Sequence, residues 1–143
     1  MCLTKTISRD NWMNDKLPKV KIAKREIKVY KALQIIPHRF YPTYESPFRD
    51  FEYKEGYHYS EDSLEVKKGT FGWGTHTQYV AKVEKGLHAY TSLRWAKREW
   101  EGYTDMIFVE MYIPEGAEYL EGDDSEIVST ELIWYKGAKI YHI

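Results

Sequence analysis

Turn residues divide the last third of the chain into short β-forming runs, and this pattern limits the fold more than any other feature of the sequence. The runs are rich in β-branched and aromatic residues, and the segments between them carry glycine, proline or acidic residues that favour turns. The runs are residues 105–113, 117–120, 126–135 and 138–143, separated by Pro114-Glu115-Gly116, Glu121-Gly122-Asp123-Asp124 and Lys136-Gly137. Short strands at this spacing predict a meander.

The rest of the chain contains further strand signals. Residues 26–36 are rich in β-formers and end before Pro37, which favours an extended residue in front of it. We predict more strands at 63–68, 78–83 and 87–90, a long packed loop with short strands at 37–62, and a loosely ordered arm or a single helical turn at 1–20. Residues 21–143 then form a single strand-dominated α+β domain.

One segment, residues 92–101, is a clear helix candidate. Thr91 or Ser92 provides a cap, and Gly102 provides a stop. Leu93, Ala96 and Trp100 fall on one face at helical spacing, so we expect this face to be buried.

Length and composition fit one folded domain. The chain has 143 residues, of which 43% are hydrophobic and 16% aromatic, more than a disordered chain carries. Cys2 is the only cysteine, which excludes a disulfide framework and fits a reducing, cytoplasmic location. No window approaches the roughly 20 apolar residues of a membrane span, and the five histidines lack zinc-site spacing, so we expect neither a membrane nor a metal partner.

Charge is distributed unevenly along the chain. The first 40 residues hold ten Lys/Arg and three Asp/Glu, whereas the remainder holds eleven and nineteen. The lysines and arginines between Lys16 and Lys31 form a stripe that attracts phosphates of a nucleic acid or a dinucleotide, or else belong to a solvated leader and a lysine-protected edge strand. Because most of the chain is acidic, we expect nucleic acid not to be the partner.

Three motifs follow one another in the second half of the chain. They are Tyr90-Thr91-Ser92 before the helix, Ile113-Pro114-Glu115-Gly116-Ala117, and Ser129-Thr130-Glu131 followed by apolar residues and Lys136-Gly137. In this order they resemble the Ser-Thr-Ser strand, the Pro-Lys-Gly-like turn and the Glu-x-Glu strand of the arginine-serine-glutamate class of ADP-ribosyltransferases. The resemblance covers residues 87–143 and implies that family's fold, with split antiparallel sheets around a dinucleotide cleft.

The resemblance implies NAD as the bound cosubstrate and cleavage of its nicotinamide–ribose bond. The ribose becomes oxocarbenium-like as nicotinamide leaves, and a fixed carboxylate stabilises the developing positive charge. Glu131 occupies the position of that carboxylate. Thr91 and Ser92 occupy the positions of the hydroxyls that hold the strands at the cleft and orient the nucleotide.

Other positions depart from the family pattern. Tyr90 replaces the first serine of the triplet, and Ser129 replaces the first glutamate of Glu-x-Glu. The first strand has no arginine, so Lys31 is our candidate for the phosphate contact, where it offers a point charge rather than a fork. His88 lies in the strand before Thr91 and is a further candidate for a nucleotide contact.

Simpler structural roles stay open for the same residues. Alternation along 126–135 puts Glu131 on one face with Ile127 and Ile133, either partly buried as a functional candidate or as an edge-strand carboxylate in water. Thr91-Ser92 also fits an ordinary helix cap, and His88 a packed, hydrogen-bonded histidine.

Two functions follow. The first is an NAD-binding, ADP-ribosyltransferase-like protein that transfers ADP-ribose or hydrolyses NAD. The second is a non-catalytic phage or bacterial factor on the same scaffold, which binds a host protein through its tyrosine-rich surface.

Overall fold

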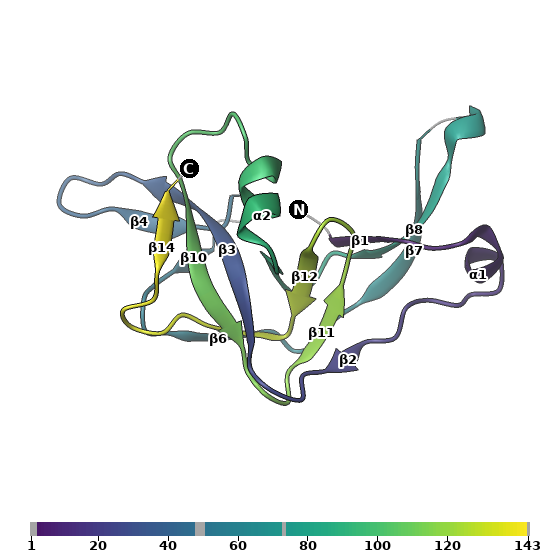
Figure 1. The fold of residues 1–143 in the computed structure, drawn as a ribbon, viewed down its shortest axis with the longest axis horizontal. Helices are drawn as coiled ribbons and strands as arrows, with labels where there is room; N and C mark the ends of the chain where they lie inside the picture. Colours follow the sequence, from purple (N-terminus) through teal and green to yellow (C-terminus); the bar gives the residue numbers. More distant parts are fainter. Residues whose placement is uncertain (1–2, 48–50, 73, 143) are drawn as a thin grey trace.

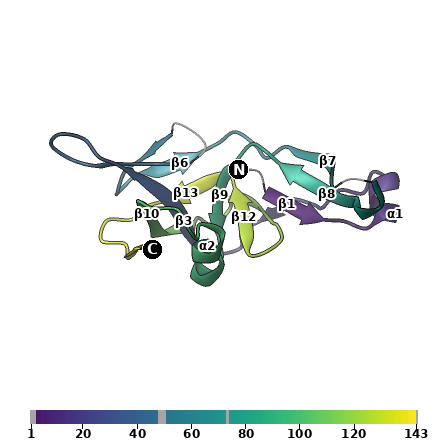
Figure 2. The same ribbon diagram turned by 90° about the horizontal axis from the view of Figure 1, so that it is seen from above.

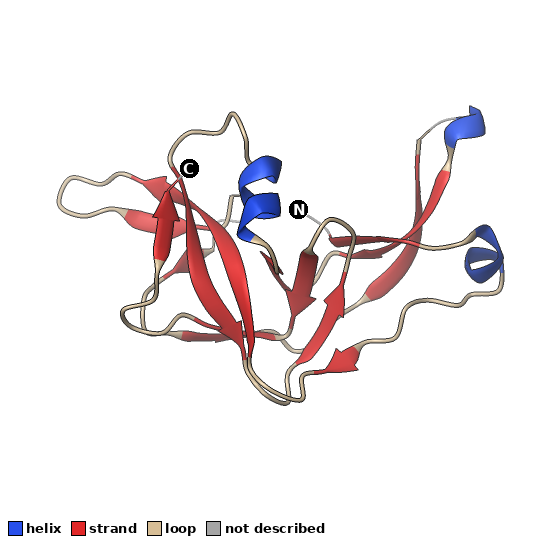
Figure 3. Ribbon diagram, viewed as in Figure 1, coloured by secondary structure: helices blue, strands red, loops and turns tan. Residues whose placement is uncertain are grey.

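Antiparallel strands are the main secondary structure of the computed structural model, which describes residues 3–47, 51–72 and 74–142 (Figures 1 and 3). Within these residues an 11-stranded sheet forms the body of the protein, and its strands are β2 (Lys21–Ile22), β3 (Ile27–Ile36), β4 (Thr43–Glu45), β5 (Glu52–Tyr53), β6 (His58–Ser60), β9 (Leu87–Tyr90), β10 (Met106–Ile113), β11 (Glu118–Glu121), β12 (Glu126–Ser129), β13 (Glu131–Ile133) and β14 (Ile140–His142). The described part of the chain also contains a three-stranded sheet of β1 (Leu3–Thr6), β7 (Val66–Phe71) and β8 (Gln78–Val83). Its two α-helices are α1 (Arg9–Met13) and α2 (Leu93–Glu99), and a 3-10 turn lies at Gly74–His76.

The strand order confirms a strand-dominated single domain with antiparallel sheets. The main sheet runs β2-β11-β12-β9-β3-β10-β13-β6, with β14 beside β10 and β4 between β3 and β5. The small sheet runs β1-β8-β7. The α1 and α2 helices are far shorter than the roughly 20 apolar residues of a membrane span, and no other described helix reaches that length.

The long strands β3 and β10 form the centre of the main sheet. They pair along eight residues each; β10 is apolar except for Glu110, and β3 carries Lys28, Lys31 and Gln34 among its apolar residues. Val29 and Leu33 of β3 point into the larger core, whereas Ala32 and Phe108 pack under α2 on the opposite face (Figure 2). Lys31 lies in the same alternating row as Val29 and Leu33, so the strand carries its side chain into the core side of the sheet.

The helix α2 forms where the sequence predicts it. Ser92 is its N-cap, and Gly102, with a φ of 88°, follows its C-terminal end. Ala96 and Trp100 are buried against Tyr90 and the sheet. The spacing of apolar residues therefore identified the buried face correctly.

The N-terminal residues are not a loosely ordered arm. Leu3 is 1% exposed and packs in a core cluster of its own with residues of β8, β11 and β12. The carbonyl of Thr4 accepts the Asp123 amide at 2.8 Å, and the amide and hydroxyl of Thr6 donate to the Asp123 carboxylate at 3.0 and 2.5 Å. The predicted helical turn is present at Arg9–Met13, but β1 is an integral strand that joins the two sheets.

The predicted strand 126–135 is broken at Thr130. The Thr130 amide donates to the Glu118 carbonyl at 3.0 Å, and the Ser129 hydroxyl donates to the Glu131 carbonyl at 2.7 Å. The break changes the alternation of the side chains, because Ile127 and Leu132, five residues apart, lie in the same core cluster. The expected common face of Ile127 and Glu131 is therefore wrong.

A partly buried carboxylate, Glu126, lies at the joint between the two sheets. One of its oxygens accepts the Thr4 amide at 3.2 Å. Burial raises the pKa of Glu126 to about 7, the Thr4 hydrogen bond lowers it, and the carboxylates of Glu99, Asp123 and Asp124 raise it further. The charge on this residue therefore changes near neutral pH.

We predict that Glu126→Gln stabilises the protein at pH 8 and not at pH 4.5. The Glu126 carboxyl binds its proton more tightly in the folded protein than in the unfolded chain. Protonation of Glu126 therefore stabilises the fold fully below about pH 4.5, and this stabilisation is lost as pH rises through about 7. Solvent screening limits the gain at pH 8 to about 1 kcal/mol. Urea denaturation at both pH values measures it, with Glu121→Gln as a control that stays within about 0.5 kcal/mol of wild type. An equal effect of Glu126→Gln at both pH values would contradict this assignment.

Candidate functional site

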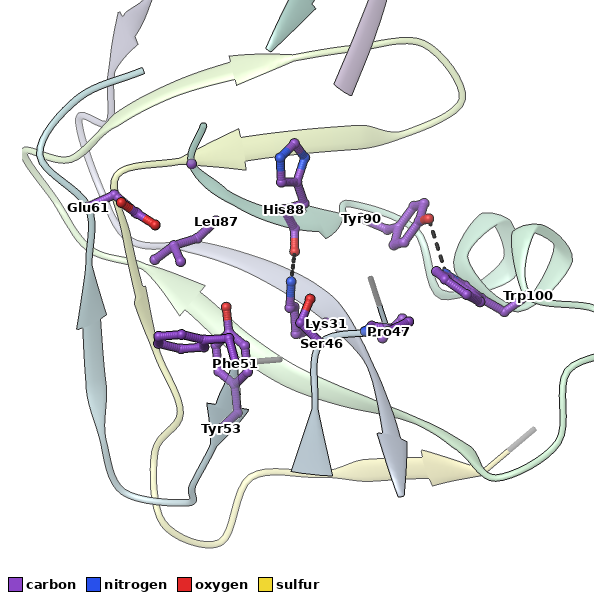
Figure 4. Close-up of a pocket in the computed structure, with 12 residues that line it drawn as sticks. Lys31, Ser46, Pro47, Phe51, Tyr53, Glu61, Leu87, His88, Tyr90 and Trp100 are labelled. Atoms are coloured by element: carbon purple, nitrogen blue, oxygen red, sulfur yellow. Dashed lines mark hydrogen bonds between the residues drawn. The ribbon is translucent and has the colours of Figure 1, made fainter. Parts of the chain in front are cut away.

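A pocket opens in the main sheet where β3 and β9 separate. The two strands pair at a single position, Tyr30 opposite Tyr90. Next to this bridge, Lys31 and Ala32 of β3 and Leu87 and His88 of β9 line a cavity of about 70 Å³ (Figure 4). The remaining lining residues come from the loop after β4, from β5 and the residue before it, from the residue after β6, from the turn before β9 and the end of β9, and from the end of α2: Ser46, Pro47, Phe51, Tyr53, Glu61, Gly86, Tyr90 and Trp100.

The ammonium group of Lys31 spans the gap between the two strands. Lys31 is only 5% exposed, and its Nζ donates to the carbonyl oxygen of His88 at 2.6 Å. The same Nζ lies 5.2 Å from the centre of the Tyr53 ring, within the range of a cation–π contact. A buried charge requires such partners, and a buried lysine in a pocket marks a candidate functional site.

Tyr90 contributes a neutral hydroxyl to the pocket wall. Its oxygen accepts the Trp100 Nε1 hydrogen at 3.2 Å, and both side chains are buried. Burial raises the pKa of Tyr90 well above its ordinary value, and the hydrogen bond from Trp100 only partly opposes this. Tyr90 therefore stays protonated at neutral pH and acts as a hydrogen-bonding group rather than as a base.

Thr91 and Ser92 lie outside the pocket and hold the start of α2. The amide of Thr91 donates to the Ser125 carbonyl at 2.8 Å, and its hydroxyl approaches the same oxygen at 3.3 Å. The Ser92 hydroxyl accepts the Trp95 amide at 3.4 Å as the N-cap of the helix. These contacts match the simpler alternative of a helix cap.

Glu131 lies at the other end of β9 from Ser92. In the antiparallel ladder between β12 and β9, Glu126 is opposite Tyr90 and Ser129 is opposite Leu87, so the chain reaches Glu131 past the beginning of β9. Ser92 follows the end of that strand, which itself spans roughly 10 Å. The cleft that we expected Glu131 to share with Thr91 and Ser92 is therefore not formed.

The carboxylate of Glu131 faces His58 on the neighbouring strand β6. Its Oε1 lies 2.9 Å from the His58 Nε2, and the two side chains are 33% and 49% exposed. Exposed pairs of this kind contribute little to stability. Glu131 is therefore a partly buried carboxylate on β13, a strand that is paired on both sides, and the alternative of an edge-strand carboxylate in water is wrong.

Most residues of the pocket wall were not predicted from the sequence. Ser46, Phe51, Tyr53 and Glu61 come from the 37–62 segment, where proline and glycine hide the short strands. Gly86 is visible in the sequence as a turn glycine, but its place at the pocket becomes clear only from the structure. Its φ is 135°, and a Cβ there would lie 2.5 Å from a Val128 methyl carbon, so the turn before β9 requires glycine. Among the residues that the structure describes, no group of His, Cys, Asp and Glu is placed to hold a metal ion.

We predict that Ser92→Ala destabilises the protein by about 1 kcal/mol, because an α2 amide loses its capping acceptor. Ser92→Asp should restore most of that stability, since a carboxylate also caps a helix. Thermal and urea denaturation measure both variants. If Ser92→Ala instead leaves stability unchanged, the cap is not the role of this residue.

Three comparisons with known proteins found no match to this chain. No protein-family model matches it, and neither a curated protein nor a solved structure does. The resemblance to ADP-ribosyltransferases therefore rests on the three sequence motifs alone.

Proposed function

We propose that the protein binds a small anionic ligand in the pocket at Lys31, and that a phosphate-bearing nucleotide such as NAD is the class to test. The observation that carries the proposal is the buried ammonium of Lys31 in the wall of an aromatic pocket. Lys31, His88 and Tyr90, which we expected to contact the cofactor, all line it. A largely apolar pocket with a few polar groups is the usual form of a small-molecule site.

The size of the pocket limits which part of a ligand enters it. A volume of about 70 Å³ holds about five water-sized positions, which is enough for one phosphate or carboxylate group and too little for a dinucleotide. We therefore propose that Lys31 binds one charged group while the rest of the nucleotide lies outside the pocket.

Cleavage of NAD in this pocket would need a carboxylate other than Glu131. Glu131 pairs with His58 and does not line the pocket, whereas Glu61 is the carboxylate among the described lining residues. If ADP-ribose is transferred or NAD is hydrolysed, we assign the stabilisation of the ribose cation to Glu61.

Calorimetric titration with NAD, ADP-ribose, nicotinamide and inorganic phosphate tests the proposal. We expect the phosphate-bearing probes to bind, and Lys31→Met to weaken them by at least about tenfold, the effect of losing one charge-assisted contact. Glu61→Gln should tighten binding, because it removes a negative charge from the pocket wall. The tighter binding of Glu61→Gln is a separate test, because this variant leaves the buried Lys31 in place.

Glu131→Gln is the matched control and should bind the probes as wild type does. Nicotinamide release by wild type, Glu61→Gln and Glu131→Gln separates binding from catalysis. The proposal fails if no probe binds at millimolar concentration, or if Lys31→Met and Glu61→Gln both bind like wild type.

A second candidate function is protein binding through the loop between β3 and β4. This loop projects from the body of the protein (Figure 1), and Phe40 and Tyr41 in it are 84% and 66% exposed. Exposed aromatic side chains, together with arginines such as Arg39, are frequent anchors of protein interfaces.

We expect a bacterial protein that immobilised wild type captures to be lost with the double variant Phe40→Ala/Tyr41→Ala. Tyr103→Ala, which removes another exposed ring far along the chain, is the control and should retain it. Equal capture by both variants would exclude the loop as the anchor.

A further inference from the structure

The segment from Lys16 to Arg25, which we call the basic strip, carries five cations and no carboxylate. It connects α1 to β3, includes β2, and passes along the lower margin of the molecule in Figure 1. All five cations are exposed: Lys16, Lys19, Lys21, Lys24 and Arg25. In the described part of the chain, none of them is in an ion pair with a carboxylate. The positive charge of the strip is therefore not neutralised within the protein.

Protection of a sheet edge explains only part of this charge. Among the described strands, β2 pairs with β11 alone, and a lysine on such an edge discourages pairing with another chain. However, β2 consists of Lys21 and Ile22, so four of the five cations lie outside it. Those four need another explanation.

The backbone of the strip is fixed in its C-terminal half, which positions the cations there. Ala23 is 2% exposed; its amide donates to the Ala117 carbonyl at 2.9 Å, and its carbonyl accepts the Gly116 amide at 2.8 Å. Lys21 and Lys24 flank this anchor. A partner that binds here does not have to order the backbone, so less of the binding free energy is lost.

The strip also borders an open groove that contains no carboxylate. The groove has a volume of about 660 Å³, far larger than the pocket at Lys31, and its lining residues are Lys21, Ile22, Lys24, Arg25, Ile27 and Tyr119. Three cations thus surround a floor of aliphatic and aromatic side chains. A positive groove with a ring on which bases can stack is typical of proteins that bind single-stranded nucleic acids.

The acidity of the chain as a whole argued against a nucleic acid, but the acidic residues lie outside the strip, which carries five cations and no carboxylate. We infer that the basic strip binds the phosphate backbone of a single-stranded nucleic acid, independently of the pocket at Lys31. Ten residues span at most about 30 Å, which corresponds to about nine stacked nucleotides at about 3.4 Å each. The strip has four lysines and one arginine. An arginine fork grips one carboxylate or phosphate with a fixed geometry, whereas a lysine is a point charge, so this composition favours binding to a row of anionic groups whatever the sequence that carries them. The ring of Tyr119 in the groove favours a nucleic acid over an acidic protein as the source of those groups.

The salt dependence of binding to a fluorescent oligothymidylate tests the inference. Five phosphate contacts at about 0.7 each predict a slope of about −3.5 in a plot of log K against log salt concentration. The affinity should then fall about 100-fold between about 50 and 200 mM salt. The triple variant Lys19→Gln/Lys21→Gln/Lys24→Gln retains two contacts, and its slope should be about −1.4.

The control is the triple variant Lys54→Gln/Lys136→Gln/Lys139→Gln, which removes the same charge from exposed lysines outside the strip. It should bind with the wild-type slope. The inference is overturned if wild type does not bind the oligonucleotide, or if the two triple variants weaken binding equally. It is also overturned if poly-glutamate displaces the oligonucleotide as well as unlabelled oligothymidylate does, since the strip would then bind an acidic protein instead.

Discussion

The antiparallel ladder between β3 and β10 is the constraint on which the rest of the structure depends. Its eight residue pairs place at the centre of the sheet two strands that carry apolar side chains on both faces, so both faces have to be covered. On one face α2 covers Ala32 and Phe108, and on the other the remaining strands cover Val29 and Leu33. Lys28 in this ladder is exposed, but Lys31 lies on the core side of the sheet and is only 5% exposed. Lys31 therefore spans to the His88 carbonyl where β9 separates from β3, and this separation creates the pocket.

The parts of the fold that depend on local sequence were predictable, and the parts that depend on distant partners were not. β3 and α2 are long enough to show their own periodicity and end signals, so their bounds agree with the sequence within a few residues. β1 is different, because Leu3 is followed by the polar Thr4, Lys5 and Thr6 and belongs to no periodic apolar run. Its burial depends on Val83 and Leu120, residues that no local pattern connects to it.

The candidate site was predictable only in part, for a similar reason. Lys31, His88 and Tyr90 come together because they lie on two strands that were both predicted. Glu131 does not join them, because after the break at Thr130 it lies on β13, where it pairs with β6 and its carboxylate faces His58. One extra residue reverses which face a strand's side chains occupy, and a motif read along a single strand contains no information on such a break. A chain can therefore carry motifs in the same order as a family while the pairing register of its strands places the corresponding residues far apart.

The two kinds of positive charge in this protein differ in what they can bind, because they differ in hydration. The ammonium of Lys31 is largely removed from water and already has a carbonyl and a ring as partners, so an incoming anion gains a strong interaction but must fit a small space. The cations of the basic strip stay hydrated, so each contributes little alone and salt weakens them together. A single buried lysine therefore favours selection of one small group. A row of exposed lysines favours a long polyanion whose phosphates repeat, whatever its sequence.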